Sequence, residues 1–136
     1  MKVFRIEHPR ERKGPYQCNH NNRTKMIRDK LGDSHDEDYD GHPVIGNCVP
    51  GWLYGFTSVP EMLKWFDGFF DLLRWGGYRI FVYEIDESEM ESEPEQCCFN
   101  PNFAEVKKVL KIPKNLENIG NLIYSNSLLI MKTTAA

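Results

Sequence analysis

Apolar and polar positions form their clearest pattern between residues 52 and 85. Residues 52–56 have the aromatic composition of a strand, and apolar residues then recur at spacings of three, four and seven over residues 61–75. Ser58 can cap the first turn of this helix, with Glu61 three residues later. Residues 78–85 are apolar on both faces, which is typical of a strand inside a sheet. The pattern therefore predicts a strand, one amphipathic helix and a buried strand.

Outside this region the pattern is weaker but still divides the chain. Residues 1–7 read as a strand with Val3 and Arg5 on one side and Phe4 and Ile6 on the other. Further strands are expected at residues 96–99 and 122–131, and a short helix at 24–31 inside a long polar loop or flap at 17–42. Residues 103–112 fit either a helix or a strand, and residues 132–136 read as a disordered tail.

These elements predict an α+β fold, with a split mixed or antiparallel sheet and a packed amphipathic helix. The length of 136 residues suits a single domain, and 40% hydrophobic residues suffice for a core. No apolar run approaches the roughly 18 to 20 residues of a membrane span, and the first residues do not resemble a secretion signal. We therefore expect a soluble, cytoplasmic protein without a membrane partner. The net charge of −3 leaves nucleic-acid or protein partners open.

Four residues offer ligand types that zinc prefers, namely Cys18, His20, His42 and Cys48. Their spacings fit no common structural zinc site, so the predicted metal content is none. The other cysteines, Cys97 and Cys98, are adjacent and do not suggest a disulfide framework. Free thiols in a reducing compartment are the simpler interpretation.

Two charged features remain to be interpreted. Arg5 either points from its strand into a site or lies in solvent at a sheet edge, and its segment alone does not decide between the two. Residues 86–95 carry six carboxylates, which must be largely solvated because like charges at this density repel one another. The last of them, Glu95, stands at the start of the strand expected at 96–99.

Common signatures such as a phosphate-binding glycine loop or a paired Cys-x-x-Cys are absent from the sequence. Three separated pieces, however, resemble motifs of the ADP-ribosyltransferase-like fold, especially its small versions in phages and mobile elements. Arg5 is similar to the family's arginine or histidine on the first strand. The aromatic strand end with Thr57 and Ser58, running into a helix, resembles its second motif. Glu95 and Gln96, before a strand that ends in an Asn-Pro turn, resemble its third.

The resemblance implies that NAD binds in the cleft of a split sheet and serves as the substrate. Arg5 would contact the diphosphate or ribose of NAD, and Glu95 would stabilise the ribose cation that forms as nicotinamide leaves. Gln96 is the alternative to Glu95 in that catalytic role. The implied NAD-binding residues are Arg5, Tyr54, Phe56, Thr57 and Ser58.

Two functions follow as hypotheses. The first is transfer of ADP-ribose from NAD to a macromolecular acceptor, a host protein or nucleic acid, which would take place in the host cytoplasm if a phage encodes the protein. The second is a small phage-type inhibitor without enzymatic activity, which would bind a host protein complex through its acidic surface.

Overall fold

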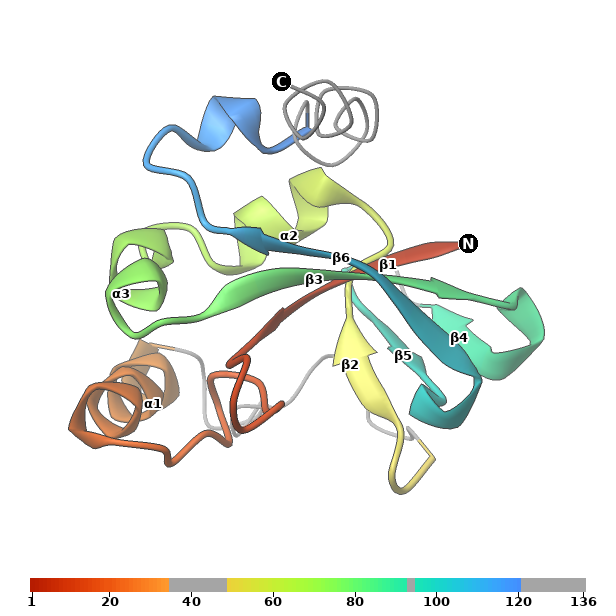
Figure 1. The fold of residues 1–136 in the computed structure, drawn as a ribbon, viewed down its shortest axis with the longest axis horizontal. Helices are drawn as coiled ribbons and strands as arrows, with labels where there is room; N and C mark the ends of the chain where they lie inside the picture. Colours follow the sequence, from red (N-terminus) through yellow and green to blue (C-terminus); the bar gives the residue numbers. More distant parts are fainter. Residues whose placement is uncertain (35–48, 93–94, 121–136) are drawn as a thin grey trace, which may run out of the picture.

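Two antiparallel three-stranded sheets form the framework of the molecule (Figure 1). The computed structural model describes residues 1–34, 49–92 and 95–120. In the first sheet the order is β1 (Lys2–Glu7), β3 (Arg79–Ile85), β6 (Ala104–Lys111). In the second the order is β2 (Leu53–Gly55), β5 (Cys97–Phe99), β4 (Met90–Ser92). The predicted α+β class is confirmed, and the strand pairs of the described residues are all antiparallel.

The two sheets meet at a single bridge between β1 and the residue that follows β2. Phe4 and Phe56 exchange two backbone hydrogen bonds across it, of 2.7 and 2.8 Å. The chain approaches closely here because Gly55 has no side chain: a Cβ on Gly55 would lie 2.6 Å from Cγ1 of Val3. Strands β4, β5, β2, β1, β3 and β6 therefore follow one another across a sheet that is split between β2 and β1.

Strand β1 contributes to a core on each of its faces, as its alternation predicts. Phe4 and Ile6 pack into the larger core, which the helices cover. Val3 points to the opposite face and packs into a smaller core with residues of β3 and β5, such as Phe81 and Phe99. Strand β3 is the central strand of its sheet, which agrees with its apolar composition on both faces.

The helix expected over residues 61–75 is in fact two short helices, α2 (Val59–Trp65) and α3 (Phe70–Trp75). Gly68 lies between them with φ of +83°, a left-handed conformation that ends a right-handed helix. The apolar spacing continues across this break, which is why periodicity alone predicted one helix. The predicted burial of the aromatic face is confirmed, since Phe66 and Phe70 are each only 3% exposed.

Several other expectations are extended or corrected. The short helix predicted at 24–31 is confirmed, and helix α1 (Asn22–Ser34) extends it at both ends into residues that were expected to be loop. Residues 104–111 form strand β6, which settles the ambiguity at 103–112. Strand β4 (Met90–Ser92), which was not predicted, lies within the acidic residues 86–95. Short 3-10 helices are η1 (Glu87–Glu89), η2 (Pro101–Phe103) and η3 (Leu116–Asn118). The expectations for residues 35–42, 122–131 and 132–136 lie outside the described residues.

Helix α3 ends at a pair of glycines, Gly76 and Gly77. Gly77 has φ of +88°, and the amide of Tyr78 donates a 3.0 Å hydrogen bond to the carbonyl of Leu73. A Cβ on Gly76 would lie 2.3 Å from Cδ1 of Ile27, so this turn also lets α1 pack against the end of α3. Across residues 1–34, 49–92 and 95–120, no helix has the length and apolar character needed to cross a membrane.

Candidate functional site

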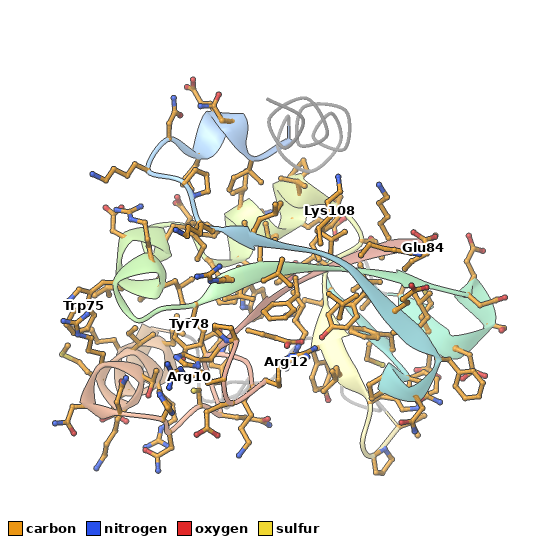
Figure 2. All side chains as sticks on the ribbon, viewed as in Figure 1. Arg10, Arg12, Trp75, Tyr78, Glu84 and Lys108 are labelled. Atoms are coloured by element: carbon orange, nitrogen blue, oxygen red, sulfur yellow. The ribbon has the colours of Figure 1, made fainter. Side chains whose placement is uncertain are left out.

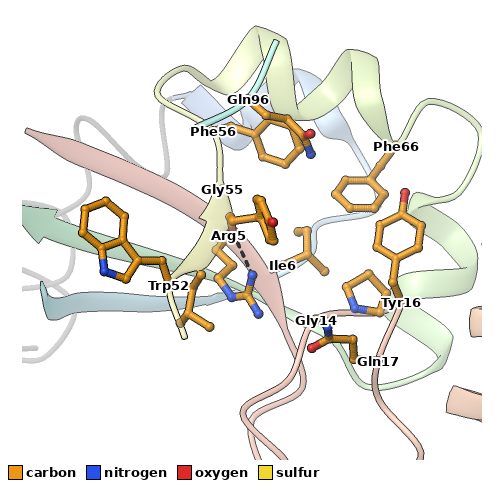
Figure 3. A pocket seen from close by; sticks show the side chains of 13 residues that line it. Arg5, Ile6, Gly14, Tyr16, Gln17, Trp52, Gly55, Phe56, Phe66 and Gln96 are labelled. Carbon is orange, nitrogen blue, oxygen red and sulfur yellow. Dashed lines mark hydrogen bonds between the residues drawn. The ribbon is translucent and has the colours of Figure 1, made fainter. Parts of the chain in front are cut away.

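A pocket opens at the split between β1 and β2 (Figure 3). Its cavity volume is about 90 Å³, and its mouth opens to solvent. The walls come from β1, the loop after it, β2 and its flanking residues, the residue after α2, and the residue before β5. The lining residues are Arg5, Ile6, Gly14, Pro15, Tyr16, Gln17, Trp52, Leu53, Tyr54, Gly55, Phe56, Phe66 and Gln96.

Arg5 is the charged residue of this lining, and it is 8% exposed. Its Nη1 donates a 2.7 Å hydrogen bond to the carbonyl oxygen of Tyr54, which ties β1 to β2 beside the bridge (Figure 3). Its Nε donates a 2.9 Å hydrogen bond to Oε1 of Glu7. Burial lowers the pKa of Arg5, and the carboxylate of Glu7 opposes this shift. Arg5 is therefore not the solvent-exposed edge arginine of the alternative interpretation.

Glu7 is fully buried and joins two arginines and a tyrosine into one network. Besides Arg5, it accepts a 2.8 Å hydrogen bond from Nε of Arg12 and a short one from the hydroxyl of Tyr83. Burial raises the pKa of Tyr83 to about 12, and the hydrogen bond to Glu7 adds to this shift. The hydrogen bond to Glu7 raises the pKa of Arg12, and this effect outweighs the opposing effect of partial burial on the half-exposed side chain.

Arg12 reaches the network because the chain turns back after β1. Its φ of 56° is left-handed, and its amide donates a 2.8 Å hydrogen bond to the carbonyl of His8. The guanidinium of Arg12, which is labelled in Figure 2, lies 4.7 Å from the ring centre of Phe81. It therefore covers the face of an aromatic ring and also pairs with Glu7. The residues after β1 thus stabilise the geometry of the strand that carries Arg5.

Aromatic side chains form the opposite wall of the pocket. The Tyr16 ring stacks near Phe66 with ring centres 6.2 Å apart, and its hydroxyl accepts a 2.8 Å hydrogen bond from Nε1 of Trp65. Phe56 contacts the edge of Phe66 at 5.9 Å. Burial raises the pKa of Tyr16, so this phenol stays neutral at physiological pH. The wall is rigid and apolar, which suits the face of a planar ring.

The structure brings together some of the predicted site residues and leaves others apart. Tyr54 and Phe56 line the pocket with Arg5, and so does Gln96, which is 5% exposed. Three predicted residues do not line it. Thr57 lies beyond the end of β2, and the Oγ of Ser58 caps α2 by accepting a 3.3 Å hydrogen bond from the amide of Glu61. Glu95 is exposed.

Nine of the thirteen lining residues were not among the predicted site residues. Gly14, Tyr16 and Gln17 belong to the segment after β1, where no site was predicted, and Phe66 was expected only in the apolar face of the helix. Trp52 was predicted as part of the strand, not of the site. An excess of aromatic residues on both sides of the split was the available signal, but spacing could not show that the two groups face each other.

The four candidate zinc ligands are placed only in part. Cys18 is buried in the larger core, whereas His20 faces His8 at 4.7 Å between ring centres and Glu11 at 3.4 Å from Nδ1 to Oε1. The other two, His42 and Cys48, lie outside the described residues. In the part of the chain that the structure describes, no three His, Cys, Asp or Glu residues are grouped so that they could hold a metal ion. The absence of a metal remains a prediction.

The arrangement defines a class of protein: an α+β protein with a split antiparallel sheet and a pocket in the split. The pocket combines the Arg5 guanidinium, two side-chain amides and an aromatic wall. Such a site can bind a planar polar ligand and hydrogen-bond its oxygen atoms. The particular family comes from sequence comparison. The model of the bacteriophage T4 Y00F protein family matches residues 1–113, so the chain belongs to that family, and this supports a phage origin. No curated protein and no solved structure matches in these comparisons.

Proposed function

We propose that this protein is an ADP-ribosyltransferase-like protein that binds NAD in the pocket between β1 and β2 and transfers ADP-ribose to a macromolecule of the host. The observation that carries the proposal is that residues from three separate segments line one pocket. Arg5, the segment 54–56 and Gln96 come from the three separated pieces that resemble that family, and all of them line the same pocket.

The pocket offers groups that suit the nicotinamide end of the dinucleotide. Phe56, Tyr16 and Phe66 supply ring faces and edges for a planar heterocycle. Arg5 supplies donors for an oxygen of the ligand, and the Gln96 amide has both a donor and an acceptor, as has the nicotinamide carboxamide. The family membership supports a phage protein, for which a host macromolecule is a natural acceptor.

The bond-breaking step requires a group that stabilises a ribose cation. Glu95 is the proposed carboxylate, and it precedes Gln96 directly, at the pocket side of β5. Because Glu95 is exposed and does not line the pocket, NAD would have to extend past Gln96 to reach it. If Gln96 takes that role instead, only its dipole is available, and a neutral amide stabilises a cation much less than a carboxylate does.

The test begins with a calorimetric titration of NAD into the wild type and into Arg5→Ala. Arg5→Ala should mainly weaken binding, because it removes a ground-state contact. Transfer of labelled ADP-ribose in a host lysate, or NAD hydrolysis, is then measured for Glu95→Gln, which keeps the shape but removes the charge. Turnover should fall by about 100-fold or more at little change in NAD affinity. Activity that survives Glu95→Gln but is lost in Gln96→Ala would move the catalytic role by one residue.

A second function is favoured by one specific observation. Of the two residues that resemble the third motif, Glu95 and Gln96, only Gln96 lines the pocket. Among the described residues, no Asp or Glu side chain is part of the lining. A fold that has kept a pocket but lost catalysis would suit a protein that acts by binding. Its surface would be the exposed part of the acidic run, which includes Asp86, Glu87 and Glu91.

The two functions give opposite results in one comparison. No NAD binding by the wild type at millimolar concentration would favour the inhibitor, and partner capture from a host lysate should then be abolished by charge reversal within residues 86–93. Arg5→Ala, whose side chain is buried, should leave that capture intact. Retained capture after charge reversal would exclude the acidic surface as the binding site.

A further inference from the structure

We infer that Glu7 is a positioning residue, which holds the Arg5 guanidinium in one orientation so that Nη2 faces the pocket. The inference rests on the proposed function for the identity of the ligand, NAD. The orientation of Arg5 is argued from hydrogen bonds within the protein alone.

The first step is the orientation of the guanidinium. Residues 5 and 7 lie on the same side of β1, because side chains alternate along a strand. Glu7 accepts from Nε of Arg5 at 2.9 Å and the carbonyl of Tyr54 accepts from Nη1 at 2.7 Å. Two partners on two different nitrogens determine the plane of the group. Nη2 remains, and it lies on the side of Gly14, where a Cβ would be 3.3 Å away (Figure 3).

The second step is the rigidity of Glu7 itself. Its side chain is 1% exposed, and both of its oxygens are engaged, Oε1 by Arg5 and Tyr83 and Oε2 by Arg12. A carboxylate with partners on both oxygens cannot rotate without losing a hydrogen bond in a buried environment. Glu7 is therefore held in place by Tyr83 of β3 and by Arg12, and it holds the Arg5 guanidinium in turn.

The third step is what this arrangement means for the ligand. Glu7 neutralises one of the two guanidinium charges, and within the protein Nε of Arg5 gives its one N–H to Glu7 while Nη1 gives one of its two to Tyr54. Arg5 therefore cannot bind a phosphate through the edge formed by Nε and Nη2, which is one of the two-point geometries of arginine–phosphate pairs. It instead presents Nη2 to one oxygen of the ligand. A lysine at position 5 would carry the charge but could not hold both protein partners.

The test has one arm that needs no ligand. In ¹⁵N-labelled protein, the Arg5 Nε–H resonance should be observable, slow to exchange and unaffected by Glu84→Gln, a matched loss of an exposed carboxylate on the neighbouring strand. In Glu7→Gln the Nε–H should exchange faster and the guanidinium should rotate faster, because the charged acceptor is lost while the Tyr54 carbonyl remains. Free rotation in the wild type would overturn the inference, and this outcome needs no variant to fold.

The second arm measures NAD affinity as a double-mutant cycle. Glu7→Gln should weaken NAD binding by about 10-fold or more when Arg5 is present, and by nothing further when Arg5 is already lysine. Arg5→Lys should bind as poorly as Arg5→Ala. Additive losses, or a lysine variant that binds like the wild type, would overturn the positioning role. If wild type binds no NAD while Arg5 is held as expected in the first arm, the proposed function fails and the positioning role stands.

Discussion

Phe66 illustrates how one residue serves both the core and the site. It is 3% exposed, and its ring contacts those of Phe56, Phe70 and Tyr16. Phe66→Ala should lower the free energy of unfolding by about 3 to 5 kcal/mol, because a large buried ring leaves a cavity. Urea denaturation measures this change.

The matched control for that substitution is Phe103→Ala, since Phe103 is 62% exposed. Its removal should change stability by no more than about 0.5 kcal/mol. Equal effects of the two variants would show that the packing of Phe66 against the other rings is not as described.

His8 makes stability depend on pH. It is 5% exposed, close to His20, and both burial and the neighbouring imidazole lower its pKa. Between its folded pKa and the unfolded value of about 6.5 the unfolded chain therefore binds the proton more tightly. Stability should decrease as the pH falls below about 6.5, with Glu11 partly opposing and Arg10 adding to the effect.

The measurement for His8 is the free energy of unfolding at pH 7.5 and at pH 5.5. The loss at the lower pH should be smaller in His8→Gln, which cannot titrate, than in the wild type. A loss of the same size in His8→Gln would assign the pH dependence to other groups.

At the scale of elements, the break between α2 and α3 depends on Gly68. Its φ is +83° and its Cβ position is open, so an alanine there meets no clash and only the backbone is strained. Gly68→Ala should destabilise the protein by about 1 to 2 kcal/mol. Thermal unfolding followed by circular dichroism checks the value.

Gly32 in α1 is the control for Gly68, because its Cβ position is also open and its backbone is helical. Gly32→Ala should stabilise the protein by about 0.4 to 1 kcal/mol through the lower entropy of the unfolded chain. A stabilising Gly68→Ala would mean that one continuous helix forms, as the periodicity alone predicted.

At the scale of the whole molecule, the junction of the two sheets depends on a missing side chain. A Cβ at Gly55 would lie 2.6 Å from Cγ1 of Val3 and 3.0 Å from the carbonyl oxygen of Phe4. Gly55→Ala should therefore force β2 away from β1 and destabilise by about 1 to 3 kcal/mol. Gly120→Ala should have almost no effect, since no atom of the described residues lies within 4 Å of the added Cβ.

Hydrogen exchange locates the effect of Gly55→Ala. The amides of Phe4 and Phe56, which bond across the split, should lose protection first, while the β1–β3 pairs keep theirs. Uniform loss of protection over both sheets would contradict a local junction.

Local chemistry determined most of the elements. The alternation of Val3 and Phe4 and the cap at Ser58 depend on neighbours a few residues away, so they could be predicted from the sequence. The resemblance to a known family made Arg5 and Gln96 site candidates, but neither the pattern nor the resemblance could show whether their side chains are buried.

The tertiary structure decided what the local pattern left open. Glu7 pairs with both Arg5 and Arg12, and Tyr16 packs near Phe66. The spacing of residues along the chain does not show which side chains meet in space, so these contacts could not be predicted. The break at Gly68 was hidden because two short helices can carry the same apolar stripe as one long helix. The pocket itself exists because β1 and β2 separate beyond a single bridge, and that separation is a property of how two sheets pack, not of either strand.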